Sequence, residues 1–228
     1  MAAGAQLALP GVEDGEPEAL RLCCGLDEVG RGALAGPLVA AAAILPPDMR
    51  ERLGKLAPFL RDSKTVPAAR REEVAALVWA HALACEVVVI SVEEINARGI
   101  GWANREAFRR LIERLRADEY VVDGRVRPAV SRRAARVRCL VRADAQVPAV
   151  SAAALVAKVR RDTMMRALHA HHPHYQWDTN VGYGTAAHLA ALRAHGPCAE
   201  HRTQFVRTAL GLAAPARHAS APVLLEDV

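Results

Sequence analysis

The sequence contains almost no lysine, because Lys55, Lys64 and Lys158 are the only three among its 228 residues. The other 27 of its 30 basic residues are arginines, a bias that reflects genome composition more than function. Paired cysteines are also missing: none of the five forms a Cys-x-x-Cys motif, and their number is odd. A structural zinc site and a disulfide framework are therefore disfavoured, and the pattern fits a reducing compartment.

Long apolar runs are absent as well. No stretch approaches the roughly 20 apolar residues that a membrane helix needs. The N-terminus carries acids and prolines where a signal peptide has a basic start and an apolar centre. No internal repeat is visible. We therefore expect a cytoplasmic protein without a membrane partner.

What is present is the composition of a soluble globular protein, with 52% hydrophobic and 24% charged residues. Residues 1–20, rich in Gly, Pro and Glu, predict a flexible leader, and residues 211–228, rich in Ala and Pro, predict a disordered tail. Residues 21–210 remain as the folded domain. The formal net charge of +5 favours an anionic partner, although many basic proteins bind none.

The chain is organised around residues 22–45, which read L-C-C-G-L-D-E-V-G-R-G-A-L-A-G-P-L-V-A-A-A-A-I-L. Two apolar runs flank a tight G-R-G turn at 30–32, as expected for a pair of buried strands. The first run ends in adjacent carboxylates, Asp27 and Glu28. Such a pair is costly at the end of a core strand unless a metal ion or a partner cation neutralises it.

Apolar runs and helical periodicities divide the rest of the domain into strands and helices. Strands are predicted at 22–27, 38–45, 85–92, 119–123 and 136–141. Helices are predicted at 67–79, 104–116 and 149–169, and a short one ends at Gly196. The string S-V-E-E after the third strand resembles a capping box.

Two more of these strands are followed by an acid. Asp123 closes the 119–123 run directly before Gly124, and Asp144 follows the 136–141 run. An Asp in such a position often does no more than begin a turn. If the strands are neighbours, however, the carboxylates meet at one edge of the sheet, where α/β proteins place their chemistry.

Converging carboxylates would repel one another without cations. Oxygen ligands without clustered Cys or His favour Mg²⁺ or Mn²⁺ over Zn²⁺. Two such ions, about 3.5–4 Å apart, can activate a water and stabilise the leaving oxygen in phosphodiester hydrolysis. The histidines at 169–174 more simply mark the end of a helix, where they suit its dipole. No Ser-His-Asp or Cys-His arrangement stands out.

Several polar groups could contact phosphate. Ser63 and Lys64 precede a predicted helix, where they either bind phosphate or act as ordinary caps. Lys158 precedes Asp162 by four residues and could simply pair with it along the helix. The segment 125–142 holds seven arginines and no acid, so a phosphate-attracting rim and a solvated loop remain equally good interpretations.

Tyr183 lies between two glycines, which let the backbone pass close to a ligand. Its ring could stack on a sugar, and its hydroxyl could bond a neighbouring group. An arbitrary tyrosine more often packs in a core. The flanking glycines favour the role at a ligand.

Five strings together resemble the motifs of the ribonuclease HII family, the type 2 ribonucleases H, over about residues 22–206. They are D-E-V-G-R-G-x-L-A-G-P from Asp27, D-S-K at 62–64, V-D-G at 122–124, A-D-A…S-A-A-A-x-x-A-K-V-x-R-D at 143–162 and G-Y-G-T-x-x-H…H-R-x-x-F at 182–205. These matches favour the functional interpretation of Asp123, Ser63, Lys64 and Tyr183.

The resemblance implies an α/β, ribonuclease H-like fold: a mixed five-stranded sheet, three antiparallel strands then two parallel, flanked by helices, with a small helical C-terminal extension. It implies a metal-dependent endoribonuclease that cleaves the RNA strand of RNA–DNA hybrids. It also implies incision on the 5′ side of a single ribonucleotide embedded in duplex DNA, leaving a 3′-hydroxyl and a 5′-phosphate.

The resemblance also assigns residues. The catalytic residues, which would hold two Mg²⁺ or Mn²⁺ ions, are Asp27, Glu28, Asp123 and Asp144. The substrate-binding residues are Gly30, Arg31, Gly32, Ser63, Lys64, Lys158 and Tyr183. The expected partners are RNA–DNA hybrids and duplex DNA containing ribonucleotides, and the expected state is a monomer. No feature of the sequence identifies a contact with a replication clamp.

Two other functions remain open. One is the sister enzyme ribonuclease HIII, against which the intact G-R-G turn argues; the roughly 20 residues before the first strand are also too few for that enzyme's usual extra domain. The other is a basic nucleic-acid-binding protein without catalysis, against which the presence of all four carboxylates argues.

Overall fold

The computed structural model describes residues 21–61, 66–125, 128 and 136–212. The strands are β1 (Cys23–Val29), β2 (Leu38–Ile44), β3 (Ala84–Ile90), β4 (Glu119–Asp123) and β5 (Arg136–Leu140). The helices are α1 (Met49–Leu53), α2 (Ala68–His81), α3 (Val92–Arg98), α4 (Ile100–Arg114), α5 (Pro148–His171), α6 (Trp177–Asn180), α7 (Ala186–His195) and α8 (Thr203–Ala209).

All five strands form one sheet in the order β3-β2-β1-β4-β5. Strand β2 pairs antiparallel with both β1 and β3. Strand β4 runs parallel to β1, and β5 runs parallel to β4. The predicted mixed sheet, with three antiparallel strands followed by two parallel ones, is therefore confirmed.

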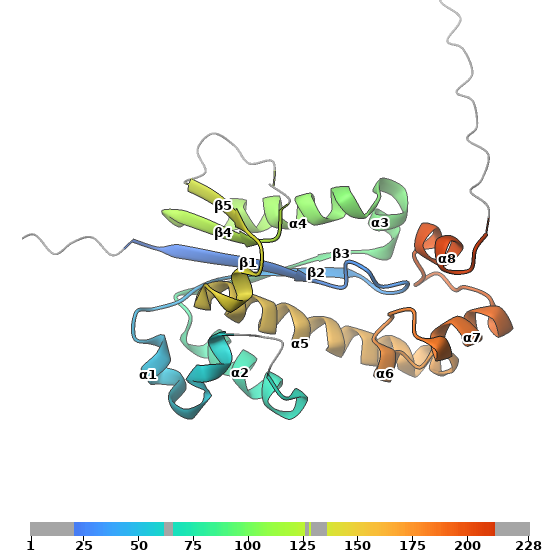
Figure 1. Ribbon diagram of the computed structural model, residues 1–228, viewed down its shortest axis with the longest axis horizontal. Coiled ribbons are helices and arrows are strands. Elements are labelled where there is room, and N and C mark those ends of the chain that lie inside the picture. Colours follow the sequence, from blue (N-terminus) through green and yellow to red (C-terminus); the bar gives the residue numbers. More distant parts are fainter. Residues whose placement is uncertain (1–20, 62–65, 126–127, 129–135, 213–228) are drawn as a thin grey trace, which may run out of the picture.

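Helices cover both faces of the sheet (Figure 1), with α3 and α4 on one face and α1, α2 and α5 on the other. Phe108 and Leu111 of α4 belong to the core on the first face. On the opposite face, Val39 and Ala41 of β2 belong to a core that includes Ala152 of α5. Strand β2 is buried on both sides, which explains why it appears in the sequence as an unbroken apolar run.

The C-terminal helices form a smaller unit at the far end of α5 (Figure 1). Its own core contains Met165 of α5 together with Tyr175, Trp177, Leu192 and Val206. The predicted helical C-terminal extension is thus present. It packs on the end of α5 rather than on the sheet. It lies beside the loop that leaves β1.

Strand β1 runs further than its apolar pattern predicts. The ladder with β2 continues through Glu28 paired with Ala40 and Val29 paired with Val39. Asp27 and Glu28 therefore lie inside the strand, which continues two residues beyond its predicted end at Asp27. Backbone pairing with a neighbour, which hydropathy does not report, decides where this strand ends.

Two stretches of helix differ from the prediction. The capping box is present at Ser91 and Glu94, and it begins the separate helix α3. The next helix starts at Ile100, four residues before its predicted start, and the two helices meet at Gly99. Helix α1 was not predicted, because five residues are too few for a periodic pattern.

Some predictions fall outside the described part of the chain. The leader, residues 1–20, is one of these, and so is the tail from residue 213 onward. Within the described ranges, no helix combines the length and apolar character needed to cross a membrane.

The buried Tyr120 allows a test of the fold that does not involve the four acidic residues. The Tyr120 hydroxyl donates to the Leu115 carbonyl at 2.6 Å and accepts from the Ala117 N–H at 3.2 Å. Tyr120 is 4% exposed, so Tyr120→Phe leaves both groups short of a partner and should cost about 1–3 kcal/mol of unfolding free energy. Urea unfolding measures this. Arg116→Ala, an exposed change in the same connection, should leave the unfolding free energy nearly unchanged, and equal losses in both variants would contradict the role.

Candidate active site

Three strands bring four acidic residues to one edge of the sheet. The parallel register of β1 and β4 puts Asp27, which Glu28 follows, beside Asp123. Asp144 lies just after β5 in a short 3₁₀ turn. The N–H of Ala143, in the same turn, donates to Asp123 Oδ1 at 2.7 Å, which ties the ends of β4 and β5 together. All four acids predicted from the sequence are thus near one another.

Two of these carboxylates are buried, with Asp27 9% and Asp144 2% exposed, and Glu28 and Asp123 are half-buried. Burial raises the pKa of Asp27 well above its ordinary value, and the carboxylates of Glu28, Asp123 and Asp144 raise it further. Burial also raises the pKa of Glu28 to about 7; Arg31 opposes this rise and Asp123 adds to it. The edge therefore concentrates negative charge that a cation would stabilise.

The donor set fits a hard divalent cation, because all four side chains offer oxygen and none offers sulfur or imidazole nitrogen. Across the described residues, no group of three Asp, Glu, His or Cys side chains is already arranged to hold an ion. The four residues therefore fit a divalent cation by the type of their donor atoms and by their charge.

Asn104 is a polar neighbour of this edge that the sequence prediction missed. It is 2% exposed, and its Nδ2 lies 3.4 Å from Glu28 Oε1. Its Oδ1 is buried and has no hydrogen-bond partner among the residues that the structure describes. The signal was available, since Asn104 interrupts the apolar face that Phe108 and Leu111 continue on the same helix.

The Gly-Arg-Gly turn follows β1 directly. Gly30 is buried with φ +88°, and a Cβ there would collide with the Arg161 guanidinium, so only glycine fits. The Arg31 side chain is 55% exposed, and its Nη1 lies 3.9 Å from Glu28 Oε1. Gly32 is exposed as well. The turn therefore presents Arg31 and Gly32 to solvent beside the acidic edge.

Two fully buried arginines, both missed by the sequence prediction, donate hydrogen bonds to the backbone of the loop that contains this turn. Arg161 of α5 donates to the carbonyls of Pro37, Val181 and Ala35 at 2.8–3.0 Å. Arg202 donates through Nε and Nη2 to the Gly36 carbonyl and through Nη1 to the Arg31 carbonyl. Burial, with a smaller effect of Arg161, lowers the pKa of Arg202 to about 9. Their only sequence signal was their place inside the motif strings.

Tyr183 is brought against the same loop. The Gly182 carbonyl accepts N–H groups from Leu34 at 2.8 Å and Ala35 at 3.2 Å. The approach is so close that a Cβ on Gly182 would collide with the Ala35 carbonyl. The Arg161 guanidinium lies 5.5 Å from the centre of the partly buried Tyr183 ring. The structure therefore places Tyr183 against the loop that contains the Gly-Arg-Gly turn.

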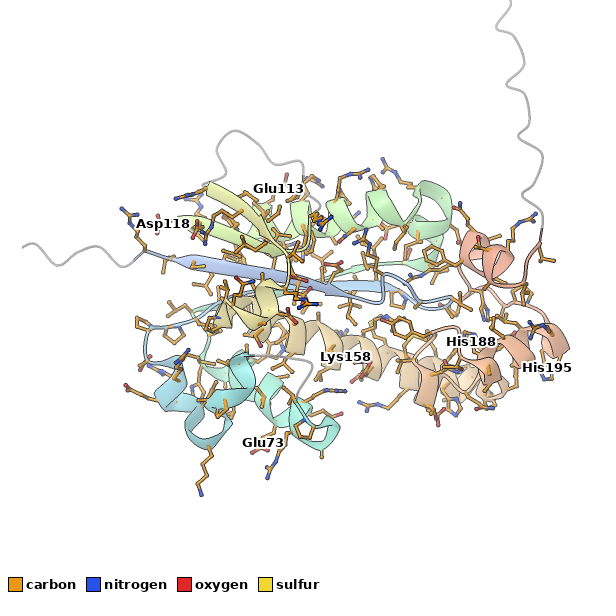
Figure 2. The ribbon with its side chains drawn as sticks, viewed as in Figure 1. Glu73, Glu113, Asp118, Lys158, His188 and His195 are labelled. Atoms are coloured by element: carbon orange, nitrogen blue, oxygen red, sulfur yellow. The ribbon has the colours of Figure 1, made fainter. Side chains whose placement is uncertain are left out.

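Lys158 faces the acids from α5, the long helix in Figure 2. Its Nζ pairs with Asp162 Oδ1 at 2.7 Å, as the helical spacing predicted. It also lines a pocket of about 240 Å³ together with Asp27, Glu28 and Arg71. The pocket therefore combines two carboxylates with two cations, and Arg71 is a further cation that the sequence prediction missed.

Other predicted contacts lie outside the described residues or are only partly covered. Ser63 and Lys64 are outside, as is most of the middle of the 125–142 segment. Of its described arginines, Arg138 pairs with Glu119 at 2.8 Å and Arg136 lies 3.7 Å from the same carboxylate. Whether this segment meets phosphate stays a prediction.

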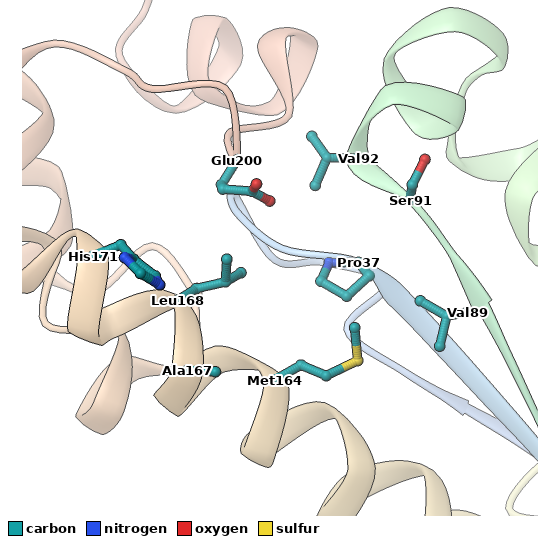
Figure 3. A pocket seen from close by; sticks show the side chains of 9 residues that line it. All are labelled: Pro37, Val89, Ser91, Val92, Met164, Ala167, Leu168, His171 and Glu200. Carbon is teal, nitrogen blue, oxygen red and sulfur yellow. The ribbon is translucent and has the colours of Figure 1, made fainter.

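A larger, mainly apolar pocket of about 420 Å³ lies between α5 and β3, next to Pro37 (Figure 3). Met164 and Leu168 of α5 line it opposite Val89 of β3, with Glu200 at its edge. None of the predicted site residues that the structure describes lines it, so the candidate chemistry belongs to the smaller, charged pocket.

Solved structures with the same architecture are ribonucleases H. The chain matches the ribonuclease HII in the PCNA:RNase HII complex from Archaeoglobus fulgidus with a TM-score of 0.67 and 26% identity, over 80% of this chain and 94% of that one. It matches ribonuclease H2 from Pyrococcus horikoshii OT3 with a TM-score of 0.66 and 23% identity, over 82% and 96%. The fold and the acidic edge define the class, an α/β protein of the ribonuclease H-like fold.

Within this class, the model of the family described as Ribonuclease HII matches residues 24–210. Ribonuclease HII from Burkholderia thailandensis is 46% identical over 195 residues, 84% of this chain and 87% of that protein. Ribonuclease HII from Burkholderia vietnamiensis is 45% identical over 195 residues, 84% and 86%. The chain belongs to the ribonuclease HII family, as its motifs predicted, and is therefore a nuclease of the hydrolase class.

The raised pKa of Glu28 predicts a change of stability with pH. Burial raises this pKa from 4.5 to about 7 in the folded protein, so between these values the folded state binds more protons than the unfolded one. The stability that this proton contributes is complete below 4.5 and is lost as the pH rises through 7. Metal-free protein should therefore lose stability relative to Glu28→Gln as the pH rises, by up to a few kcal/mol.

Urea unfolding of both proteins in a chelator, at several pH values, measures this difference. The comparison with Glu28→Gln is needed because burial lowers the pKa of His188 and His201, which change stability in the opposite sense. Glu113→Gln, at an exposed glutamate on α4, serves as the control and should follow the wild type at every pH. A constant difference between wild type and Glu28→Gln would contradict the prediction.

Proposed function

We propose that this protein is an endoribonuclease that hydrolyses the RNA strand of RNA–DNA hybrids and incises 5′ of single ribonucleotides embedded in duplex DNA. The products carry a 3′-hydroxyl and a 5′-phosphate, which would make the incision a first step of ribonucleotide excision repair. Membership of the ribonuclease HII family supports activity on hybrids. The observation that carries the proposal is the cluster of four buried or half-buried carboxylates beside the loop that contains the Gly-Arg-Gly turn and contacts Tyr183.

The four carboxylates are the proposed ligands of two Mg²⁺ or Mn²⁺ ions. Two such ions, when bound, activate a water and offset the charge that develops on the leaving oxygen. Asp123 and Asp144 each raise the pKa of Asp27 by repulsion at this edge, so the protein itself favours the binding of cations there. A structure of Bst-RNase HIII in complex with Mn²⁺ shares the fold, with a TM-score of 0.59 and 20% identity.

The neighbouring groups are the proposed contacts to the nucleic acid. Lys158 lines the pocket of Asp27 and Glu28, where its ammonium offsets the charge of a phosphate. We assign Ser63 and Lys64 to phosphate as well, from their place in the D-S-K motif. These contacts position the strand and carry no information on its sequence.

The ribonucleotide itself is assigned to the Gly-Arg-Gly turn and Tyr183. The 2′-hydroxyl, a donor and an acceptor, distinguishes RNA from DNA at a given site. The backbone of Gly30, Arg31 and Gly32 offers both kinds of partner beside the acids. The neighbouring Gly182 is hydrogen-bonded to the same loop. Tyr183 supplies a ring that can stack on the sugar at the junction of RNA and DNA.

Asp123→Asn tests the proposed metal ligands. The change keeps the shape of the side chain but removes a charge, so cleavage in Mg²⁺ should fall by more than about 100-fold, since even partners outside the ligand shell cost up to that much. Binding to a hybrid, measured by fluorescence anisotropy, should persist. Wild-type cleavage should also vanish in a chelator.

Asp118→Asn is the matched control, because Asp118 stands just before β4, at the end opposite Asp123, and its Oδ2 only accepts the N–H of Leu22. It should cleave like the wild type. Near-normal turnover of Asp123→Asn, or full activity in excess chelator, would falsify the metal assignment.

Tyr183→Ala tests the assignment of the ribonucleotide. Stacking on an aromatic ring is worth about 1–3 kcal/mol, so incision at a single ribonucleotide should fall roughly ten- to a hundredfold. The melting temperature and duplex binding should stay close to the wild type. Tyr183→Phe should keep most of the activity if stacking dominates. A variant that instead melts much lower, and loses activity on every substrate in proportion, would show that Tyr183 only packs.

A further inference from the structure

A pair of buried histidines joins Tyr183 to the C-terminal segment. His188 lies in the first turn of α7 with no exposed surface, at the right of Figure 2. Its Nδ1 lies 2.9 Å from the Tyr183 carbonyl oxygen. Its Nε2 lies 3.2 Å from Trp177 Nε1 and 3.1 Å from His201 Nε2.

The donors around the pair fix where each proton lies. A Trp Nε1–H can only donate, so His188 Nε2 carries no proton, and its neutral ring must carry one on Nδ1 and donate it to the Tyr183 carbonyl. His201 then donates its Nε2–H to His188. Its Nδ1 is left to accept the N–H of Cys198 at 3.0 Å. Every ring nitrogen is satisfied only when both histidines are neutral.

The surroundings keep them neutral. Burial lowers the pKa of His201 to about 4, and His188 lowers it further, as do His172 and His174. Burial also lowers the pKa of His188. Near pH 7, therefore, the chain of donors from His201 through His188 to the Tyr183 carbonyl is intact.

Both ends of this chain hold the loop that follows β1. His201 forms a β-bridge with Ala35. On the other side, the Gly182 carbonyl, adjacent to Tyr183, accepts the N–H groups of Leu34 and Ala35. The histidine pair therefore spans the two segments between which the loop is fixed, and a change in its length or donors shifts Tyr183 relative to the loop.

We infer that His188 and His201 are positioning residues that set Tyr183 against the Gly-Arg-Gly loop and thereby determine how strongly a single ribonucleotide is preferred over a run of RNA. The inference rests on the proposed function, which assigns Tyr183 to the ribonucleotide. Neither histidine touches the substrate. Both act through the Tyr183 backbone.

Three substitutions of His188 separate its contacts. His188→Asn keeps an N–H donor near the position of Nδ1, toward the Tyr183 carbonyl. His188→Gln places its amide near the position of Nε2, so it loses that donor while it retains a partner for Trp177 and His201. His188→Ala removes both. His195→Ala, at an exposed histidine on the same helix, is the control.

The measurement is kcat and KM on two matched duplexes, one with a single ribonucleotide and one with a run of several, together with the melting temperature of each variant. The ratio of interest is kcat/KM on the single ribonucleotide divided by kcat/KM on the run. We expect His188→Ala and His188→Gln to lower this ratio by about tenfold, the equivalent of one lost hydrogen bond. His188→Asn should restore the ratio to within about threefold of the wild type, because it keeps the donor. His195→Ala should leave the ratio unchanged.

A double-mutant cycle shows whether His188 acts through Tyr183. In a Tyr183→Ala background, His188→Gln should lower the ratio little further, since the group it positions is already gone. Additive losses would overturn the inference. So would an unchanged ratio in His188→Gln, or equal losses on both duplexes that follow the melting temperature.

Different results would contradict the proposed function and the positioning role. Wild-type protein that cleaves the run of RNA but not the single ribonucleotide contradicts the proposed function itself. Wild-type protein that cleaves both, with a ratio that no His188 variant changes, contradicts only the positioning role. Should His188→Ala not fold, the Asn and Gln variants alone decide, because they differ only in which contact they keep.

Discussion

The structure depends on two guanidinium groups that are buried against backbone oxygen. Arg161 and Arg202 are fully buried and donate to carbonyls of the loop that leaves β1. Neutral carbonyls satisfy the N–H groups but compensate only part of the lost hydration of the charge, which is why burial lowers the pKa of both arginines. The loop's shape therefore depends on charges from distant parts of the chain as well as on the positive φ that Gly30 supplies.

The acidic edge presents the opposite charge a short way along the same strand. Its carboxylates are buried or half-buried beside one another, so the protein contains a region of concentrated negative charge followed directly by a loop held by positive charge. Lys158 and Arg71 line the pocket between the acids and α5. Arg161 and Arg202 are buried, so Lys158 and Arg71 are the cations placed to meet a phosphate, while a divalent cation would offset the charge of the acids. The proposed phosphodiester chemistry would use this polarity.

Much of the fold could be predicted because its core strands are apolar and its long helices are periodic. Each acid could be named from its place at the end of an apolar run, but their convergence depends on the strand order. The end of β1 could not be predicted, since its pairing with β2 continues after the apolar run stops. The two arginines were missed because their partners lie 124 and 166 residues away in sequence, a separation at which composition and periodicity carry no information.

That separation also bears on how the protein is made. The strands and their acids are complete once residue 144 has been synthesised, whereas Arg202, which locks the loop, follows much later. Because chains emerge from the N-terminus, a nascent chain can assemble its charged edge before it can shape the neighbouring loop. The loop beside the acidic edge is thus the last part of the candidate site to be completed, once Arg202 has been synthesised.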